Sequence, residues 1–298
     1  MKKTLIVIVG ATGIGKTDLS IEIAEYFNTF ILSSDSRQFY KELKIGTAPP
    51  TEKQLKKIKH FFIGNKSIEN YYNASSFEVE VLSILEKIFL EKNFAIMVGG
   101  SGMYVDAVCN GIDDLPTVDI NIRKKLIDKL ENEGIESLRF DLQRMDPKHY
   151  EVVDLKNAKR ILKALEISIM TNKPYSSFLK KKVKKRNFKI IKIALKMDRG
   201  KLYERINKRV DIMIENGLIE EVKKFYNKKH LNALNTVGYK EFFAHWDGEY
   251  SLEKAIELVK RNSRRLAKRQ ITWFKRDKNI NWFYNNEKEK IINFIKKN

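Results

Sequence analysis

The first part of the chain constrains its fold most strongly. Residues 5–9, LIVIV, form an aliphatic run, which predicts a strand buried on both faces, as in parallel sheets. Residues 10–17, GATGIGKT, follow directly and fit the pattern G-x-x-x-x-G-K-[ST]. Apolar residues then recur at helical spacing, at Leu19, Ile23 and Phe27. A strand, a glycine-rich loop and a helix in this order predict a phosphate-binding loop in an α/β fold.

The chemistry of this loop indicates an anionic ligand. Its glycines allow backbone N–H groups to point inward around an anion, at the positive end of the helix dipole. Lys16 would neutralise a terminal phosphate, and the Thr17 hydroxyl would hold Mg²⁺. The residues predicted to bind the phosphorylated ligand are Gly10, Ala11, Thr12, Gly13, Ile14, Gly15, Lys16 and Thr17. The pattern leaves open which ligand this is.

The charge of the chain suits a polyanionic partner. Its 58 Lys and Arg against 38 Asp and Glu give a net charge of +20. A lysine-rich composition that only keeps the protein soluble is the competing interpretation. No apolar run is long enough for a membrane helix, and Cys109 is the single cysteine, so we expect a cytoplasmic protein without disulfides.

Further patterns predict how the chain is organised. Strands are expected at residues 30–33, 94–98 and 190–197, and a capping box at Ser75 and Glu78 before a helix. From 116 to 186 strand signals stop and helical periodicity takes over, ending in the basic run 180–186. We therefore predict a catalytic core of residues 1–114 and 188–298 and a helical insertion of residues 115–187. The chain after residue 197 is predicted to be helical.

Two strand ends carry candidate site residues. Asp35 follows the second strand and should lie near the phosphate loop, because ligands bind beyond the carboxyl ends of strands in open α/β sheets. Ser101 follows the third strand, where glycines replace the acidic residue typical of nucleotide motors and switches. Both residues could instead cap helices.

Basic residues gather in the last third of the chain. Arg205 and Arg209 lie one helical turn apart and share a face. A basic stripe is predicted on the helix at 251–274, formed by Arg261, Arg265, Lys268 and Arg269. Residues 236–240, TVGYK, combine a basic and an aromatic side chain in a tight loop. The four histidines show no ligand spacing and are assigned no function.

The ordered set of motifs resembles the tRNA dimethylallyltransferase (IPP transferase) family. The matching segments are GATGIGKT at 10–17, SDSRQFY at 34–40, GTA at 46–48, VGGSGMY at 98–104, the pattern R-x-x-x-A-L-E at 160–166, R-I-x-x-R-V-D at 205–211, VGYKE at 237–241 and A-K-R-Q-x-T-W-F at 267–274. They keep the family order over nearly the whole chain.

The resemblance implies a P-loop NTPase-like parallel sheet flanked by helices, with an all-helical insertion. It also implies transfer of a dimethylallyl group from its diphosphate to N6 of adenosine 37 in the tRNA anticodon loop. Residues 10–17 would bind the prenyl diphosphate, Asp35 would be the general base, Ser101 stands where the family usually has Thr, and Arg205 would lie near the diphosphate.

The resemblance also implies the tRNA-binding residues and partners. These residues are Asp35, Ser36, Arg37, Gln38, Ser101, Arg123, Lys159, Arg160, Ile161, Leu162, Lys163, Asn235, Val237, Gly238, Tyr239 and Lys240, to which the basic stripe adds Arg265 and Arg269. Lys159 and Lys163 replace frequent arginines and lose bidentate geometry. Residues 60–64 depart from the family pattern and are assigned no role. We expect a monomer that uses Mg²⁺ and binds dimethylallyl diphosphate and a tRNA anticodon stem-loop.

Two other functions fit part of the sequence. A small-molecule or nucleoside kinase would use the same loop for ATP, but a small acceptor needs no basic insertion or basic C-terminal helix. A non-catalytic RNA-binding regulator gated by nucleotide is less favoured, because the acidic residue of nucleotide switches is missing after the third strand.

Overall fold

The computed structural model describes residues 2–113, 115–116, 119–179 and 183–298. Its centre is a six-stranded sheet in the order β3-β2-β4-β1-β5-β6, and every neighbouring pair is parallel. The strands are β1 (Thr4–Val9), β2 (Ile31–Ser33), β3 (His60–Phe61), β4 (Phe94–Gly99), β5 (Lys189–Lys196) and β6 (Asn281–Tyr284). The predicted parallel α/β core is confirmed.

The register brings the functional strand ends to one edge of the sheet. β1 lies between β4 and β5, with Val9 opposite both Gly99 and Ala194. β2 pairs with β4 on the other side, where Ser33 faces Val98. The segments that follow β1, β2 and β4 therefore emerge next to one another.

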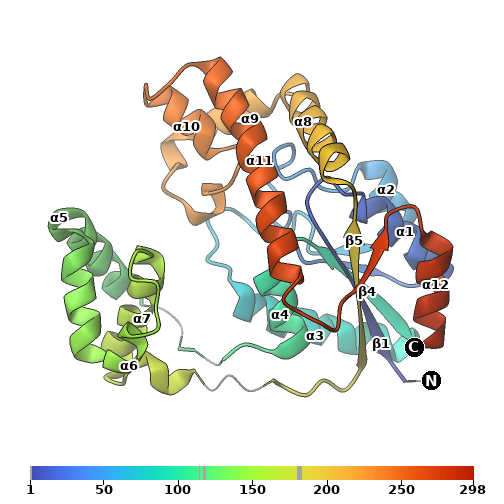
Figure 1. The fold of residues 1–298 in the computed structure, drawn as a ribbon, viewed down its shortest axis with the longest axis horizontal. Helices are drawn as coiled ribbons and strands as arrows, with labels where there is room; N and C mark the ends of the chain where they lie inside the picture. The colour runs from blue at the N-terminus through green and yellow to red at the C-terminus, as the bar shows by residue number, and fades with distance from the viewer. Residues whose placement is uncertain (1, 114, 117–118, 180–182) are drawn as a thin grey trace. The chain divides into compact units, whose positions relative to one another are not determined.

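Nine helices accompany the sheet within residues 2–110 and 185–298 of the described chain. They are α1 (Lys16–Tyr26), α2 (Glu52–Lys57), α3 (Ala74–Glu91), α4 (Gly102–Asn110), α8 (Arg199–Glu215), α9 (Leu218–Lys223), α10 (Lys240–Trp246), α11 (Leu252–Phe274) and α12 (Lys288–Lys297). α1, α2 and α12 lie on one side of the sheet, and α3, α4 and α11 lie on the other (Figure 1). Right-handed crossovers between parallel strands produce this division.

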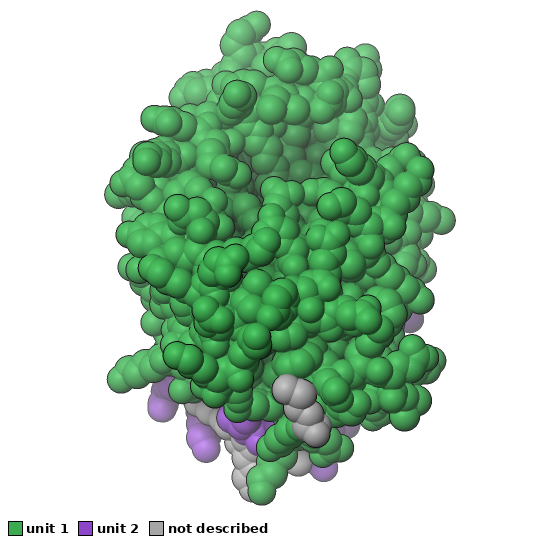
Figure 2. Space-filling model, turned by 90° about the vertical axis from the view of Figure 1, so that its right-hand side faces the viewer, with its two compact units in different colours: residues 1–109, 185–298 green, residues 110–184 purple. Residues whose placement is uncertain are grey.

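The chain forms two compact units, coloured separately in Figure 2: residues 1–109 with 185–298, and residues 110–184. The second unit contains α5 (Ile120–Met145), α6 (Pro147–Tyr150), α7 (Ala158–Thr171) and a 3₁₀ turn at Tyr175–Phe178. α5 is interrupted at Gly134, which has a φ of 78°. Apolar side chains of α5 and α7, among them Leu138 and Leu165, form the core of this unit.

Two sequence expectations need correction. The cap of α3 is Asn73, whose side chain accepts from the N–H groups of Ser75 and Ser76, so no capping box forms at Ser75. The chain after residue 197 is not wholly helical, because β6 extends the sheet before α12. β6 has only 4 residues, which makes its type hard to predict from periodicity.

The basic run at 180–186 falls partly outside the described residues, which omit 180–182. Arg186 at its end is not a solvated charge. It forms a 2.7 Å ion pair with Glu78 and donates to the carbonyl oxygens of Ala107 and Val108. No helix in the described part of the chain has the length and apolarity needed to cross a bilayer.

Candidate active site

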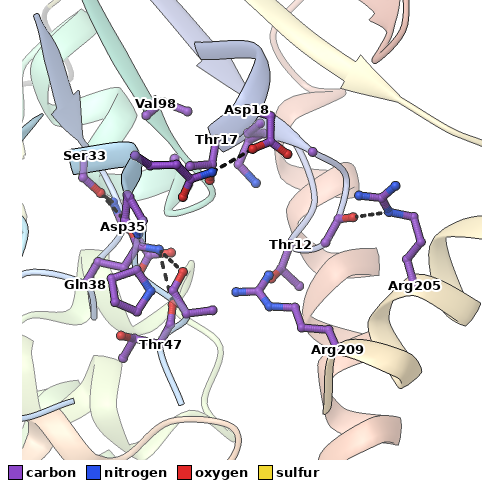
Figure 3. Close-up of a pocket in the computed structure, with 18 of the residues that line it drawn as sticks. Thr12, Thr17, Asp18, Ser33, Asp35, Gln38, Thr47, Val98, Arg205 and Arg209 are labelled. Atoms are coloured by element: carbon purple, nitrogen blue, oxygen red, sulfur yellow. Dashed lines mark hydrogen bonds between the residues drawn. The ribbon is translucent and has the colours of Figure 1, made fainter. Parts of the chain in front are cut away.

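A cavity of about 580 Å³ lies at the carboxyl ends of β1, β2 and β4. Its wall brings together residues that are far apart in the sequence, including Lys16, Thr17, Asp35 and Arg205. Asp35 and Gln38 come from one side, and Thr12, Arg205 and Arg209 come from the other (Figure 3). The cavity therefore joins the phosphate loop to the carboxylate that the sequence placed beside it.

The phosphate loop takes the backbone shape that its glycines allow. Gly10, Gly13 and Gly15 have φ values of 146°, 77° and 100°, a region that side chains rarely adopt. At Gly13 an added Cβ would also lie 3.1 Å from Cγ1 of Ile206. The loop leads directly into α1 at Lys16, so its N–H groups lie at the positive end of that helix.

Lys16 reaches back over this loop. Its Nζ donates to the carbonyl oxygens of Gly10 at 3.0 Å and Ala11 at 2.8 Å. Burial lowers the pKa of Lys16 to about 8; Asp35 opposes this shift, and the positive charge of Arg209 adds to it. A cation so poorly solvated favours an anionic ligand in contact with it.

Arg205 and Arg209 extend from α8 to the same loop. Arg205 Nε donates to the Gly13 carbonyl at 3.0 Å, and Arg209 Nη1 donates to Thr12 Oγ1 at 3.2 Å. Burial lowers the pKa of Arg209, and Asp35 partly opposes that shift. Arg209 was not among the site residues expected from the sequence. The signal was its spacing of four residues from Arg205, which places both side chains on one helix face.

The segments after β2 and β4 are hydrogen-bonded to each other. Ser101 Oγ accepts from the Ser36 N–H at 2.9 Å and donates to Ser36 Oγ at 3.1 Å. Asp35 Oδ1 accepts from the Arg37 N–H at 2.9 Å, which closes a tight turn and not a helix. The hydroxyl of Ser101 thus holds the segment that carries Asp35.

Gln38 lies in the cavity wall, and Arg37 points to another loop. Gln38 accepts from Ser33 Oγ at 3.0 Å and donates to the carbonyl oxygens of Thr47 and Ala48 at 3.3 and 3.0 Å. Arg37 Nη2 donates to the Asn235 carbonyl at 3.4 Å. Gln38 therefore shapes the cavity, while Arg37 connects it to the loop at 236–240.

Within that loop, Tyr239, which the resemblance assigns to tRNA, has a structural role. Its side chain is fully buried, and its hydroxyl donates to Glu221 Oε1 at 2.5 Å. Glu221 also accepts from three N–H groups, those of Lys44, Ile45 and Gly46. Tyr239 therefore anchors the loop that precedes Thr47, whereas Lys240 is exposed.

In the helical unit, two of the residues that the resemblance assigns to tRNA pack in the core. Ile161 is fully buried in the unit's core, and Leu162 packs partly against the same core. Arg123 Nε forms a 2.8 Å ion pair with Glu166 Oε1. Burial raises the pKa of Glu166, against the opposing charges of Arg123 and Lys163. Lys159 and Arg160 are exposed on α7, so their charges are available to a partner.

The predicted basic stripe on α11 is exposed at Arg265, Lys268 and Arg269, whereas Arg261 is half-buried. Gln270 on the same helix lines the cavity and was assigned no role from the sequence, although it lies in one of the family-like motifs. α11 therefore presents positive charge to solvent and a neutral amide to the site.

A second, smaller cavity of about 100 Å³ adjoins the first. Asp35, Thr12, Thr47 and Arg209 line both cavities. The rest of the smaller wall is mostly apolar and includes Val237 and Gly238, with the additional members Arg37, Gly46, Ile206, Val210, Met213, Leu218, Thr236, Val259, Ser263 and Leu266. Asp35 therefore lies where two approaches to the site meet.

The side chains at this site fit a metal ion that would be coordinated mainly by the phosphates of a bound substrate. Among the described residues no group of three or more His, Cys, Asp or Glu side chains could hold a metal. Thr17 lines the cavity at the N-terminus of α1. A magnesium ion typically takes few protein ligands together with substrate phosphates, which matches this arrangement.

Comparison with known proteins agrees with the fold and the motifs. The family model described as IPP transferase matches residues 38–277. The tRNA dimethylallyltransferase 1 of Bacteroides fragilis is 52% identical over 98% of this chain and 97% of its own length. The tRNA dimethylallyltransferase of Flavobacterium johnsoniae is 46% identical over 99% and 98% of the two chains.

Solved structures show the same similarity. The tRNA isopentenylpyrophosphate transferase of Bacillus halodurans superposes with a TM-score of 0.71 and 34% identity, covering 99% of this chain and 96% of that one. A eukaryotic dimethylallyltransferase acting on tRNA gives a TM-score of 0.82 and 27% identity, covering 99% and 80%. With its P-loop, its motifs and these relatives over its full length, the chain belongs to the IPP transferase family.

Proposed function

We propose that this protein transfers a dimethylallyl group from dimethylallyl diphosphate to N6 of adenosine 37 in the anticodon loop of tRNA. The observation that carries the proposal is the shared cavity, where Lys16 and Arg209 face the same carboxylate, Asp35. Such a site combines cations for a phosphorylated donor with a base for an acceptor. The relatives named above are tRNA dimethylallyltransferases, which supports the same activity.

The diphosphate would be bound by residues 10–17. Lys16, Arg205 and Arg209 all contact this loop, and together with its N–H groups they would stabilise the negative charge that develops as the diphosphate leaves. Donors fixed in advance around a developing charge are an effective source of transition-state stabilisation. A magnesium ion bound by the Thr17 hydroxyl and the diphosphate would neutralise further charge on the leaving group.

Asp35 would accept the proton that the adenine amine loses. A bond forms between N6 and the allylic carbon, the carbon–oxygen bond to the diphosphate breaks, and the diphosphate leaves with the electron pair. Because the amine lone pair is delocalised into the ring, proton removal helps this step, typically by roughly 10²–10⁴-fold. Asp35 lines both cavities, so donor and acceptor can approach it from different sides.

The acceptor would reach Asp35 through the smaller cavity. Val237, Gly238 and Arg37 line it, and the family resemblance assigns these residues to tRNA. An adenine must leave its stack to enter such a pocket, which costs a few kcal/mol. Phosphate contacts from exposed cations, including Lys240, Arg265 and Arg269, can offset this cost. We also propose that the protein acts as a monomer in the cytoplasm.

One labelled-substrate experiment separates this function from the two others. The protein is incubated with unmodified tRNA and either labelled dimethylallyl diphosphate or labelled ATP. We expect label from the prenyl donor to appear in tRNA, at the adenosine next to the anticodon. Phosphate transfer from ATP to a small acceptor would indicate a kinase. Binding of tRNA without transfer of either label would indicate a regulator.

A further inference from the structure

We propose that Gln270 is a positioning residue that sets the distance between the phosphate loop and the segment carrying Asp35. The inference rests on the proposed prenyl transfer and assigns a role to a residue that this function leaves unexplained. It concerns α11, the helix that also carries Arg265 and Arg269 on its exposed side.

The amide of Gln270 connects the two halves of the site. Its Oε1 accepts from the Thr12 N–H at 2.8 Å, and its Nε2 donates to the Gly100 carbonyl at 3.0 Å. Thr12 belongs to the loop after β1, and Gly100 to the loop after β4. The amide oxygen of this side chain therefore binds the phosphate loop, and its amide N–H group binds the loop after β4.

Gly100 in turn is linked to the segment that carries Asp35, the proposed base. Gly100 precedes Ser101, whose hydroxyl bonds both the N–H and the hydroxyl of Ser36. Ser36 in turn follows Asp35 directly in the chain. A continuous path of short contacts thus runs from Thr12 through Gln270 to the segment that holds the carboxylate.

The side-chain amide of Gln270 packs closely against the backbone of Gly100. A Cβ added at Gly100 would lie 2.2 Å from Gln270 Nε2, so the amide occupies the space that a side chain would need. Three residues further along α11, Trp273 Nε1 donates to Asp106 Oδ2 on α4 at 2.9 Å. A Cβ at Gly102 would lie 2.2 Å from Trp273 Cδ1. α11 is therefore fixed against the start of α4 at two successive points.

Prenyl transfer depends on the spacing that this path controls. The donor carbon is placed by the phosphate loop, and the acceptor nitrogen is placed near Asp35. A misplacement of about 1 Å between reacting groups can lower a rate by roughly 10²-fold. Loss of the Gln270 contacts should therefore slow the chemical step while leaving each binding surface in place.

The first test replaces Gln270 with methionine, which keeps the length of the side chain and removes both hydrogen bonds. We expect the single-turnover rate of prenyl transfer to fall by about 10- to 100-fold. Dissociation constants for dimethylallyl diphosphate and for tRNA, measured separately, should each change by less than about threefold. The matched control is Glu289→Met, an exposed position on α12 outside the proposed binding surfaces, which should transfer at the wild-type rate.

A double-mutant cycle tests whether Gln270 acts through Gly100. Gly100→Ala should slow transfer strongly in the wild-type chain, because the added methyl group meets the amide. In the Gln270→Ala chain the same change should have less than about a twofold effect, since the space is then empty. A smaller effect of Gly100→Ala in the Gln270→Ala chain than in the wild-type chain supports the proposal. The same fold-change in the rate in both chains overturns it.

Two further results would overturn the proposal. One is a Gln270→Met variant that transfers the prenyl group at the wild-type rate. The other is a loss of activity that is explained entirely by weaker tRNA binding or by a lower melting temperature. The wild-type protein is assayed in parallel under the same conditions. If the wild-type protein itself transfers no prenyl group, the proposed function fails; if it transfers while Gln270→Met does too, only the role of Gln270 fails.

Discussion

At the scale of single residues, the charge state of Lys16 is the most sensitive feature of the site. Its ammonium group donates to two carbonyl oxygens of its own loop, those of Gly10 and Ala11. A bound diphosphate would supply full negative charge in place of these neutral oxygens. The lowered pKa of Lys16 reflects its burial, which the nearby charge of Asp35 only partly offsets.

This leads to a prediction about pH. The pKa of Lys16 is lowered to about 8 in the free protein, and a bound diphosphate would raise it. Affinity for dimethylallyl diphosphate should therefore be constant below about pH 7.5 and fall as pH rises through 8, by up to about tenfold per unit. Calorimetric titration between about pH 6.5 and 9.5 measures this.

Lys16→Ala is the control for this profile. It should bind the diphosphate weakly at every pH, without the decrease near pH 8, and should bind tRNA normally. A wild-type affinity that stays constant up to about pH 9.5 would contradict the assignment of Lys16 to the diphosphate.

At the scale of elements, the sequence predicted those strands, loops and helices whose structure is determined by neighbouring residues in the chain. The buried strand β1, the glycine-rich loop and the start of α1 follow from residues that have few alternatives. Asp35 at the end of β2 and Ser101 after β4 could be placed because parallel strand ends meet at one edge. These two residues are joined in the structure through Ser36.

What the sequence did not predict depends on distant contacts. The sequence places Tyr239 in a tight loop but does not indicate that Glu221, 18 residues earlier, provides a buried acceptor for its hydroxyl. Gln270 lies 258 residues after Thr12, its hydrogen-bond partner. Arg186 pairs with Glu78, 108 residues before it. Periodicity and motif spacing carry no information about pairs so far apart.

The buried hydrogen bond of Tyr239 gives a prediction for the loop that it anchors. Tyr239→Phe removes a hydrogen bond to a buried carboxylate, so the free energy of unfolding should fall by about 1.5–3 kcal/mol. Affinity for tRNA should change little. Lys240→Ala should show the reverse, because that side chain is exposed: weaker tRNA binding and unchanged stability.

Urea unfolding and tRNA binding, measured on both variants, provide the comparison. If Tyr239→Phe weakens tRNA binding at full stability, the hydroxyl of Tyr239 contributes to tRNA binding and the structural assignment is wrong.

At the scale of the whole molecule, the net charge of +20 becomes a testable statement about tRNA. Binding to a polyanion releases counterions, so the logarithm of the binding constant should fall linearly with the logarithm of the salt concentration. The double substitution Arg265→Gln and Arg269→Gln should reduce the magnitude of this slope by about 1.4–1.8, which is about 0.7–0.9 for each phosphate contact that is lost.

Filter-binding titrations in about 50–300 mM KCl give these slopes. The matched control is a pair of substitutions away from the predicted surfaces, Lys53→Gln and Lys56→Gln on α2, which should leave the slope unchanged. Equal slopes for all three proteins would mean that α11 does not contact phosphates and that its charge serves only solubility.

The central claim is that Asp35 removes the proton while residues 10–17 hold the leaving diphosphate. The most direct measurement is the single-turnover transfer rate of Asp35→Asn, with both substrates at saturating concentrations established by separate binding titrations. We predict affinities for both substrates within a few-fold of wild type, and a transfer rate lower by at least about 10²-fold. Transfer at the wild-type rate by this variant would contradict the account.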